Sequence, residues 1–137
     1  MYTDLYKTFL SADDTLRVYD RDRLIFSSKK ERLLPLMEYI AGAGSRPAPV
    51  VIFDKVMGNA AALLSVRANS REVFSPLGSE IAIKTLDKHN IVYHLDKTVP
   101  FILRPDGVRM CPMEELSIGK EHGEFYLVMK ARLEAER

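Results

Sequence analysis

The stretch "VVIFDKVMGNAAALL", residues 50–64, decides the fold. Its four leading apolar residues follow a proline, a pattern typical of a strand that is buried on both faces of a sheet. Residues 58–69 then carry small and aliphatic side chains and predict a helix that packs closely on that sheet. A buried strand that leads directly into a helix is the basic unit of an α/β fold. The stretch therefore predicts an α/β protein in which 50–53 forms a central strand.

The residues before this unit predict a β-hairpin with a helix on each side. The expected elements are a short first helix capped by Thr3 and Asp4, strands at 15–19 and 24–27 joined by a polar turn at 20–23, a helix within 32–44 that ends at Gly42 and Gly44, and a stiff linker at 45–49. Alternation of apolar and polar residues indicates the two strands, and apolar residues at helical spacing indicate the second helix. Pro35 is expected in the first turn of that helix.

The residues after the unit alternate between strands and helices. We expect strands at 72–75 and 91–95, a helix at 78–90 with Ser79 as its N-cap, a short helix after Cys111, and an amphipathic helix at about 124–137. The hairpin requires antiparallel pairing, and the later crossovers favour parallel pairing. The sequence thus predicts a single domain over 1–137, a three-layer α/β/α sandwich with a mixed sheet.

Composition excludes several classes of protein. The chain has 137 residues, 47% of them hydrophobic, so it can form a core without disulfides or metals. Twenty basic and nineteen acidic residues give a net charge of +1, which provides no clear signal for nucleic-acid binding. One cysteine excludes an internal disulfide, and no apolar run reaches the roughly 18 residues of a membrane span. We expect a cytoplasmic protein.

Four residues after the central strand form the first candidate site. Asp54 and Lys55 follow the strand directly, at the end where open α/β sheets bind ligands. Gly58 and Asn59 stand at the helix start, where free backbone N–H groups attract anions. Asp54 would act as a base or orienting group, and Lys55, Gly58 and Asn59 would hold an anionic ligand. The alternative is an exposed turn followed by a helix whose alanines serve packing alone.

The motif "CPME", residues 111–114, forms the second candidate site. Pro112 suits the first position of a helix, which makes Cys111 its N-cap, where the helix dipole favours a thiolate. Cys111 would then be a nucleophile, with Glu114 beside it. The alternative is that Cys111 is a small buried apolar residue and that Glu114 only caps the helix.

A zinc site is not expected in this chain. Catalytic zinc requires three protein ligands and structural zinc four, whereas the chain has one cysteine and three scattered histidines. His94 stands two residues before Asp96 in a predicted strand, so the two side chains could share one face of the sheet. We predict no metal and no cofactor.

The segments "DKVMGNAAALL", "VPFILRPDG" and "MCPMEE" resemble a family of small prokaryotic proteins known as domain of unknown function 1893. The resemblance spans residues from about 14 to 118. It implies a fold similar to that of cytidine deaminases, with a site between two helix starts. Deaminases of that fold hold zinc through H-x-E or C-x-E and P-C-x-x-C motifs. Where such a metal-ligand motif would open the helix after the central strand, this chain has Asp54, Lys55 and Gly58, and "CPME" has one cysteine where two are needed. These departures argue against zinc-dependent deamination.

Three functions remain open from the sequence. The first is an enzyme that acts on a small anionic or nucleotide-like ligand through Cys111, Asp54 and Lys55 without a metal. The second is a ligand-binding or sensor domain without catalysis. The third is an interaction module that forms a homodimer through the final helix, where Phe125, Leu127, Val128 and Met129 provide more apolar surface than one core face needs.

Overall fold

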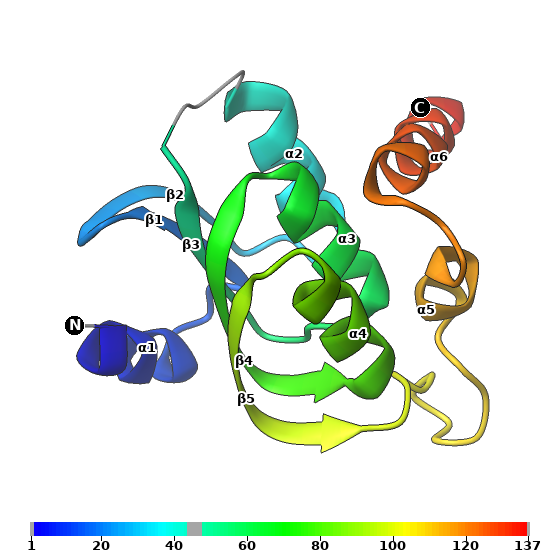
Figure 1. Cartoon of the computed structure of the whole chain (residues 1–137), viewed down its shortest axis with the longest axis horizontal. Coiled ribbons are helices and arrows are strands. Elements are labelled where there is room, and N and C mark those ends of the chain that lie inside the picture. The colour runs from blue at the N-terminus through cyan, green and yellow to red at the C-terminus, as the bar shows by residue number, and fades with distance from the viewer. Residues whose placement is uncertain (1, 44–47, 137) are drawn as a thin grey trace.

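A computed structural model describes residues 2–43 and 48–136 of the chain (Figure 1). Its helices are α1 (Tyr2–Ser11), α2 (Leu34–Ala43), α3 (Asn59–Arg67), α4 (Glu80–Lys88), α5 (Pro112–Ser117) and α6 (His122–Ala135). Its strands are β1 (Leu16–Asp20), β2 (Arg23–Ser28), β3 (Val50–Asp54), β4 (Ser70–Ser79) and β5 (Val92–Val99). None of the helices in these residues combines the length and the apolar character that crossing a membrane requires.

The five strands form one mixed sheet in the order β2-β1-β3-β4-β5. The hairpin pairs β1 with β2 antiparallel, and β1 also runs antiparallel to β3. The pairs β3–β4 and β4–β5 are parallel, joined by helical crossovers through α3 and α4. Every residue of β3 is buried, as expected of a central strand that is covered on both faces. The predicted α/β class and the mixed sheet are confirmed.

Helices cover both faces of the sheet, but unequally. Within the described residues, α1 alone packs on one face, where its aromatic side chains meet β1, β3 and β4 (Figure 1). This smaller cluster contains Tyr2, Tyr6, Phe9, Tyr19, Val51, Phe53 and Phe74. The larger core lies on the opposite face and includes buried residues of α2, α3, α4 and α6. The layers agree with the expected helix–sheet–helix arrangement.

Several boundaries differ from the sequence-based expectation. Thr3 and Asp4 lie inside α1 rather than before it, because Tyr2 belongs to the helix and is buried against the sheet. Gly42 also lies inside its helix, α2, and does not end it. Gly44 and the first three residues of the predicted linker lie outside the described residues. Two expectations are confirmed: Pro35 lies in the first turn of α2, and Ser79 is the N-cap of α4, where its hydroxyl accepts the Ala82 N–H at 3.1 Å.

The final helix uses part of its apolar surface in the core. Phe125 and Met129 are buried against the larger core, and Leu133 packs at its edge. Leu127, by contrast, points outward and is 64% exposed. Most of the apolar surface on this helix therefore serves the fold of the chain itself.

Candidate functional site

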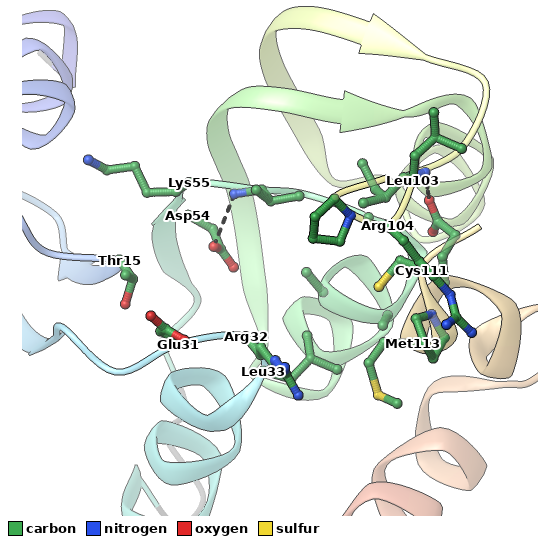
Figure 2. A pocket seen from close by; sticks show the side chains of 18 residues that line it. Thr15, Glu31, Arg32, Leu33, Asp54, Lys55, Leu103, Arg104, Cys111 and Met113 are labelled. Carbon is green, nitrogen blue, oxygen red and sulfur yellow. Dashed lines mark hydrogen bonds between the residues drawn. The ribbon is translucent and has the colours of Figure 1, made fainter. Parts of the chain in front are cut away.

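A pocket of about 450 Å³ opens at the carboxyl end of β3. Its walls come from the residue before β1, the segment before α2, the β3–α3 connection with the start of α3, and the segment between β5 and α5 with the start of α5 (Figure 2). The lining residues are Thr15, Glu31, Arg32, Leu33, Asp54, Lys55, Val56, Gly58, Ala60, Ala61, Ile102, Leu103, Arg104, Pro105, Cys111, Pro112, Met113 and Glu114. Ligands of open α/β sheets bind at this end of the strands. The pocket thus unites both candidate sites, which are more than 50 residues apart in sequence.

Asp54 places an ionisable group in this pocket. It is the last residue of β3 and is buried. Burial raises the pKa of its carboxyl from 3.8 to about 7, and hydrogen bonds from the backbone of Val56 and Lys55 offset only part of that rise. The Val56 N–H donates to Oδ1 across 3.4 Å. A carboxyl with such a pKa exchanges protons near neutral pH, which suits a general acid or base.

Lys55 lines the pocket but directs its ammonium elsewhere. Its Nζ donates to the Ala12 carbonyl at 2.9 Å and lies 4.6 Å from the centre of the Phe9 ring. Figure 2 shows the side chain extending away from Cys111, on the far side of Asp54. The charge of Lys55 is therefore used to attach the end of α1 to the β3–α3 connection. In this arrangement its ammonium is already occupied by protein groups.

The start of α3 is occupied by the carboxylate of Glu114. This buried side chain accepts the Asn59 N–H at 2.6 Å through Oε1 and the Ile102 N–H at 2.5 Å through Oε2. An anion at a helix N-terminus satisfies free N–H groups and interacts favourably with the dipole. Gly58 allows this approach, because a Cβ there would lie 3.0 Å from Ile102 Cγ1 and 3.2 Å from Glu114 Oε1. The Glu114 carboxylate therefore occupies the anion-binding position at the start of α3.

The Asn59 side chain is equally committed to the fold. It is buried, and its Nδ2 donates to the Ser117 hydroxyl at 3.0 Å and to the Ser117 carbonyl at 3.3 Å. Its Oδ1 accepts a hydrogen bond from the Thr85 hydroxyl. Asn59 thereby links α3 to α4 and α5. The polar atoms of Asn59 and Glu114 are thus bonded to groups of the protein itself.

Cys111 is the N-cap of α5, and Pro112 occupies the first turn, as the sequence predicts. The Cys111 N–H donates to the Ile102 carbonyl at 2.8 Å, which ties the cap to the preceding segment. Its side chain is half-buried, makes no capping hydrogen bond, and places its sulfur at the pocket (Figure 2). Cys111 and Asp54 therefore share one pocket but stand on different walls of it.

Two arginines complete the pocket, and the sequence alone did not single them out. Arg32 precedes α2 and has a positive φ of 61°, and Arg104 belongs to the segment that follows β5. Both residues are exposed, and the Arg104 Nε donates to the Met110 carbonyl at 3.3 Å. Only the "ILRPDG" turn signal marks the Arg104 segment in the sequence. The exposed part of the lining therefore carries two arginines beside one carboxylate, Glu31, while the interior is mainly apolar.

His94 and Asp96 both lie in β5, two positions apart, so they share one face of the sheet. They bond to different partners: His94 contacts Glu72, with 2.6 Å between Nε2 and Oε2, and Asp96 accepts from the Tyr6 hydroxyl. Within residues 2–43 and 48–136, no three His, Cys, Asp or Glu side chains are grouped so that they could hold a metal ion.

Comparison with known proteins places the chain in a family. The family model described as domain of unknown function 1893 (TM1506) matches residues 5–132. The chain belongs to this family. The match extends beyond the 14–118 range expected from the motifs and includes most of α1 and α6.

A solved structure of another domain of unknown function 1893 protein is closely similar. It is the TM1506 protein from Thermotoga maritima, with 26% sequence identity and a TM-score of 0.84. The alignment covers 94% of this chain and 87% of that one. The search of curated proteins found no match. The comparisons therefore establish the family and the fold of its members, and the chemistry of the pocket has to be argued from its residues.

The raised pKa of Asp54 predicts a pH-dependent stability. Because the pKa is higher in the folded state than in the unfolded state, ionisation of Asp54 costs folding free energy as pH rises from about 4 to about 7. The free energy of unfolding of the wild type, relative to Asp54→Asn, should fall by about 2 to 3 kcal/mol between pH 5 and pH 8. Urea denaturation at both pH values tests this. Parallel pH profiles for the two proteins would contradict it.

The contacts of Glu114 predict a large structural effect. Glu114→Gln keeps the shape of the side chain but leaves one buried N–H without a carboxylate acceptor, so it should lower the free energy of unfolding by about 2 to 4 kcal/mol. Glu115→Gln is the matched control, since the neighbouring side chain is exposed and should change stability by less than about 0.5 kcal/mol. Equal denaturation midpoints for the two variants would refute the role of Glu114.

Proposed function

We propose that the chain binds a small anionic, nucleotide-like ligand in the pocket at the end of β3 and transfers a proton through Asp54 without a metal. The observation that carries the proposal is a buried carboxyl, with a pKa of about 7, in the same pocket as a thiol and two arginines. Strongly perturbed groups in a concave site are characteristic of functional centres.

The rim arginines are the anion-binding groups in this proposal. Arg32 and Arg104 lie on opposite sides of the pocket mouth, from the α2 and α5 sides (Figure 2). Arginine binds phosphate and carboxylate groups through paired hydrogen bonds, which favours a charged group at the rim. The apolar interior, with Leu33, Ile102 and Met113, suits a flat or aliphatic part of the ligand. Lys55, Gly58 and Asn59 support this site from behind.

Asp54 and Cys111 are the reactive groups. Near pH 7 the Asp54 carboxyl is present in both protonation states, so it can accept a proton from the ligand and return it. Cys111 is the proposed nucleophile, because its sulfur is accessible from the pocket. Glu114 positions Cys111 indirectly, through the Ile102 backbone that both residues contact.

A cytidine deaminase-like fold is part of the same proposal. Its support is a five-stranded mixed sheet with helices on both faces, together with a pocket at the starts of α3 and α5. The sequence has no P-C-x-x-C motif, and no H-x-E or C-x-E motif opens α3. The proposed chemistry therefore relies on Asp54 and Cys111, and the fold contributes the location of the site.

A non-catalytic ligand-binding or sensor domain is the second candidate. The observation that favours it is the commitment of the α3 start to Glu114, which leaves a mainly apolar pocket with few directed polar groups. Turnover of a bound ligand that is lost in both Asp54→Asn and Cys111→Ser supports the enzyme. Binding that persists in both variants, with no turnover by the wild type, supports the sensor.

A ligand screen should identify the anion and its site. Thermal shift with nucleosides, nucleotides and inorganic phosphate should show stabilisation by phosphate-bearing compounds only. Arg104→Gln should then weaken binding by about 10- to 100-fold, the value of one charge-assisted hydrogen bond. Arg109→Gln is the matched control, because it removes the same charge from the same segment outside the pocket lining. Equal dissociation constants for the two variants would contradict the proposal.

Alkylation of the sole cysteine provides an independent test. Iodoacetamide reports on Cys111 alone, and a bound nucleotide should slow the reaction by about tenfold or more because it fills the pocket in front of the sulfur. The urea-unfolded chain, which should react equally fast with and without the nucleotide, is the control. An unchanged rate in the folded protein at saturating nucleotide would place the ligand elsewhere.

A further inference from the structure

The edge strand β5 offers a regular, unpaired side. β5 and β2 are the two edges of the sheet, and no other segment of the described chain pairs with the outer side of β5. Alternate residues of an edge strand direct their N–H and C=O groups away from the sheet, where they can pair with another strand. The β1–β2 ladder contains a register irregularity between Val18 and Tyr19, which disfavours further pairing at that edge. The β4–β5 ladder has none.

The side chains of β5 differ in character between its two faces. His94 and Asp96 belong to the face that α1 covers: the His94 ring stacks on Phe74 with 4.2 Å between centres, and the Tyr6 hydroxyl donates to Asp96 Oδ2 at 2.8 Å. Leu95, on the opposite face, packs against the larger core. Because side chains alternate along a strand, its neighbours Tyr93 and Lys97 share that face.

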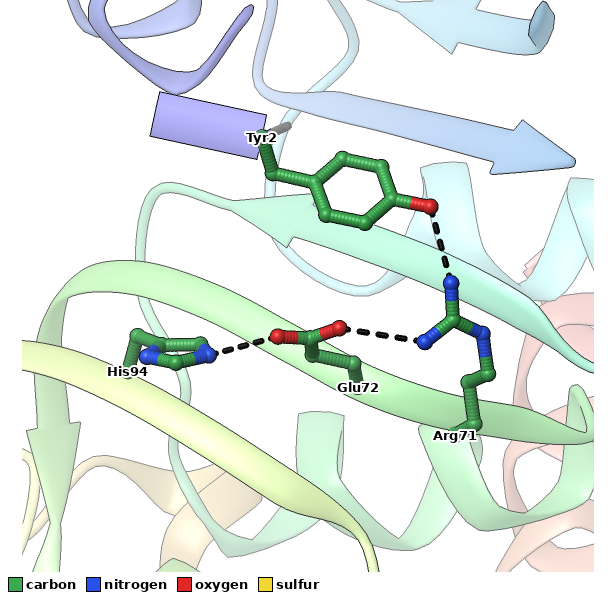
Figure 3. A network of polar contacts seen from close by, with 4 residues as sticks. All are labelled: Tyr2, Arg71, Glu72 and His94. Atoms are coloured by element: carbon green, nitrogen blue, oxygen red, sulfur yellow. Dashed lines mark hydrogen bonds and ion pairs between the residues drawn. The ribbon is translucent and has the colours of Figure 1, made fainter. Parts of the chain in front are cut away.

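A chain of polar contacts holds His94 in a defined orientation (Figure 3). Its Nε2 contacts the Glu72 carboxylate at 2.6 Å, Glu72 accepts from Arg71 at 3.2 Å, and Arg71 donates to the Tyr2 hydroxyl at 2.9 Å. Tyr2 in turn is the first residue of α1 and is buried. The Nδ1 of His94 and the Oδ1 of Asp96 take no part in the hydrogen bonds described above. Both atoms are therefore open to a further partner.

We propose that β5 pairs antiparallel with β5 of a second copy of this chain, about a two-fold axis at Leu95. The axis sets Leu95 opposite Leu95 and joins the two sheets into one of ten strands. In this register His94 faces Asp96 of the second copy, and this pairing occurs twice. Tyr93 faces Lys97 of the second copy, also twice. Opposite partners in an antiparallel pair lie close enough for such side chains to interact directly.

The charges along β5 select this register over its neighbours. A two-fold axis at Asp96 would place two aspartates opposite each other, and an axis at Lys97 would do the same with two lysines. An axis at His94 would set two histidines together and leave Asp96 opposite the apolar Val92. Like charges directly opposite each other destabilise a sheet. Only the axis at Leu95 opposes His94 to Asp96 and keeps the apolar residue Leu95 at the centre.

Engineered disulfides test both the dimer and its register. The axis at Leu95 places Val92 opposite Thr98 of the second copy, at a separation that a disulfide can bridge. Both residues are exposed, Val92 by 55%, so their replacement should leave the fold intact. In a Cys111→Ser background, Val92→Cys combined with Thr98→Cys should give a covalent dimer on mild oxidation. Within one chain the two positions lie about 20 Å apart, too far to join.

The single variants Val92→Cys and Thr98→Cys, each with Cys111→Ser, are the matched controls. In the proposed register neither cysteine lies near its own copy, so both single variants should remain monomers on a non-reducing gel. Sedimentation equilibrium of the wild type between about 1 and about 100 µM should show a reversible dimer. A wild type that stays monomeric, or single variants that cross-link as fully as the double variant, would overturn the proposal.

Discussion

The contact of the Glu114 carboxylate with two backbone amides organises the pocket at the end of β3. Glu114, in α5, bonds to Asn59 at the start of α3 and to Ile102 in the segment that follows β5. These partners lie 55 and 12 positions before Glu114 in the sequence. Together with the Asn59–Ser117 contacts, the Glu114 contact fixes the Cys111 segment against the start of α3. A carboxylate inside the protein is costly to bury unless its oxygens are bonded, and here a helix N-terminus supplies that compensation. The geometry of the pocket thus depends on an internal ion–dipole contact.

Asp54 has the opposite energetic character. The backbone of Val56, at 3.4 Å, and of Lys55 bonds its carboxyl only weakly against the effect of burial, which opposes its ionisation. The same pocket therefore contains the Glu114 carboxylate, which stabilises the fold, and the Asp54 carboxyl, which destabilises the fold when it is charged. Structures keep such unfavourable groups where a function requires them, because the fold alone would favour their replacement. This contrast is the main reason for assigning reactivity to Asp54 and a positioning role to Glu114.

Local sequence signals predicted the elements well. The apolar run 50–53, the cap at Ser79 and the proline after Cys111 each determine local structure through neighbouring residues, so their placement could be inferred. The roles of Lys55 and Glu114 could not, because the partners of their charged atoms, Ala12 and Asn59, lie 43 and 55 positions away. Arg32 and Arg104 were missed for a related reason. They lie in irregular segments, where neither periodicity nor capping identifies a residue.

The single helix on one side of the sheet makes the two halves of the core unequal. Within the described residues, α1 is the one helix that shields Phe53 and Phe74 there, whereas several helices cover the opposite side. Local opening breaks only the contacts of the segment that opens, so the detachment of α1 costs less free energy than unfolding of the whole chain. Detachment would also release Tyr6 from Asp96 and Lys55 from Ala12. The amino-terminal segment thereby contacts both the β5 edge, through Tyr6, and the pocket residue Lys55, through Ala12.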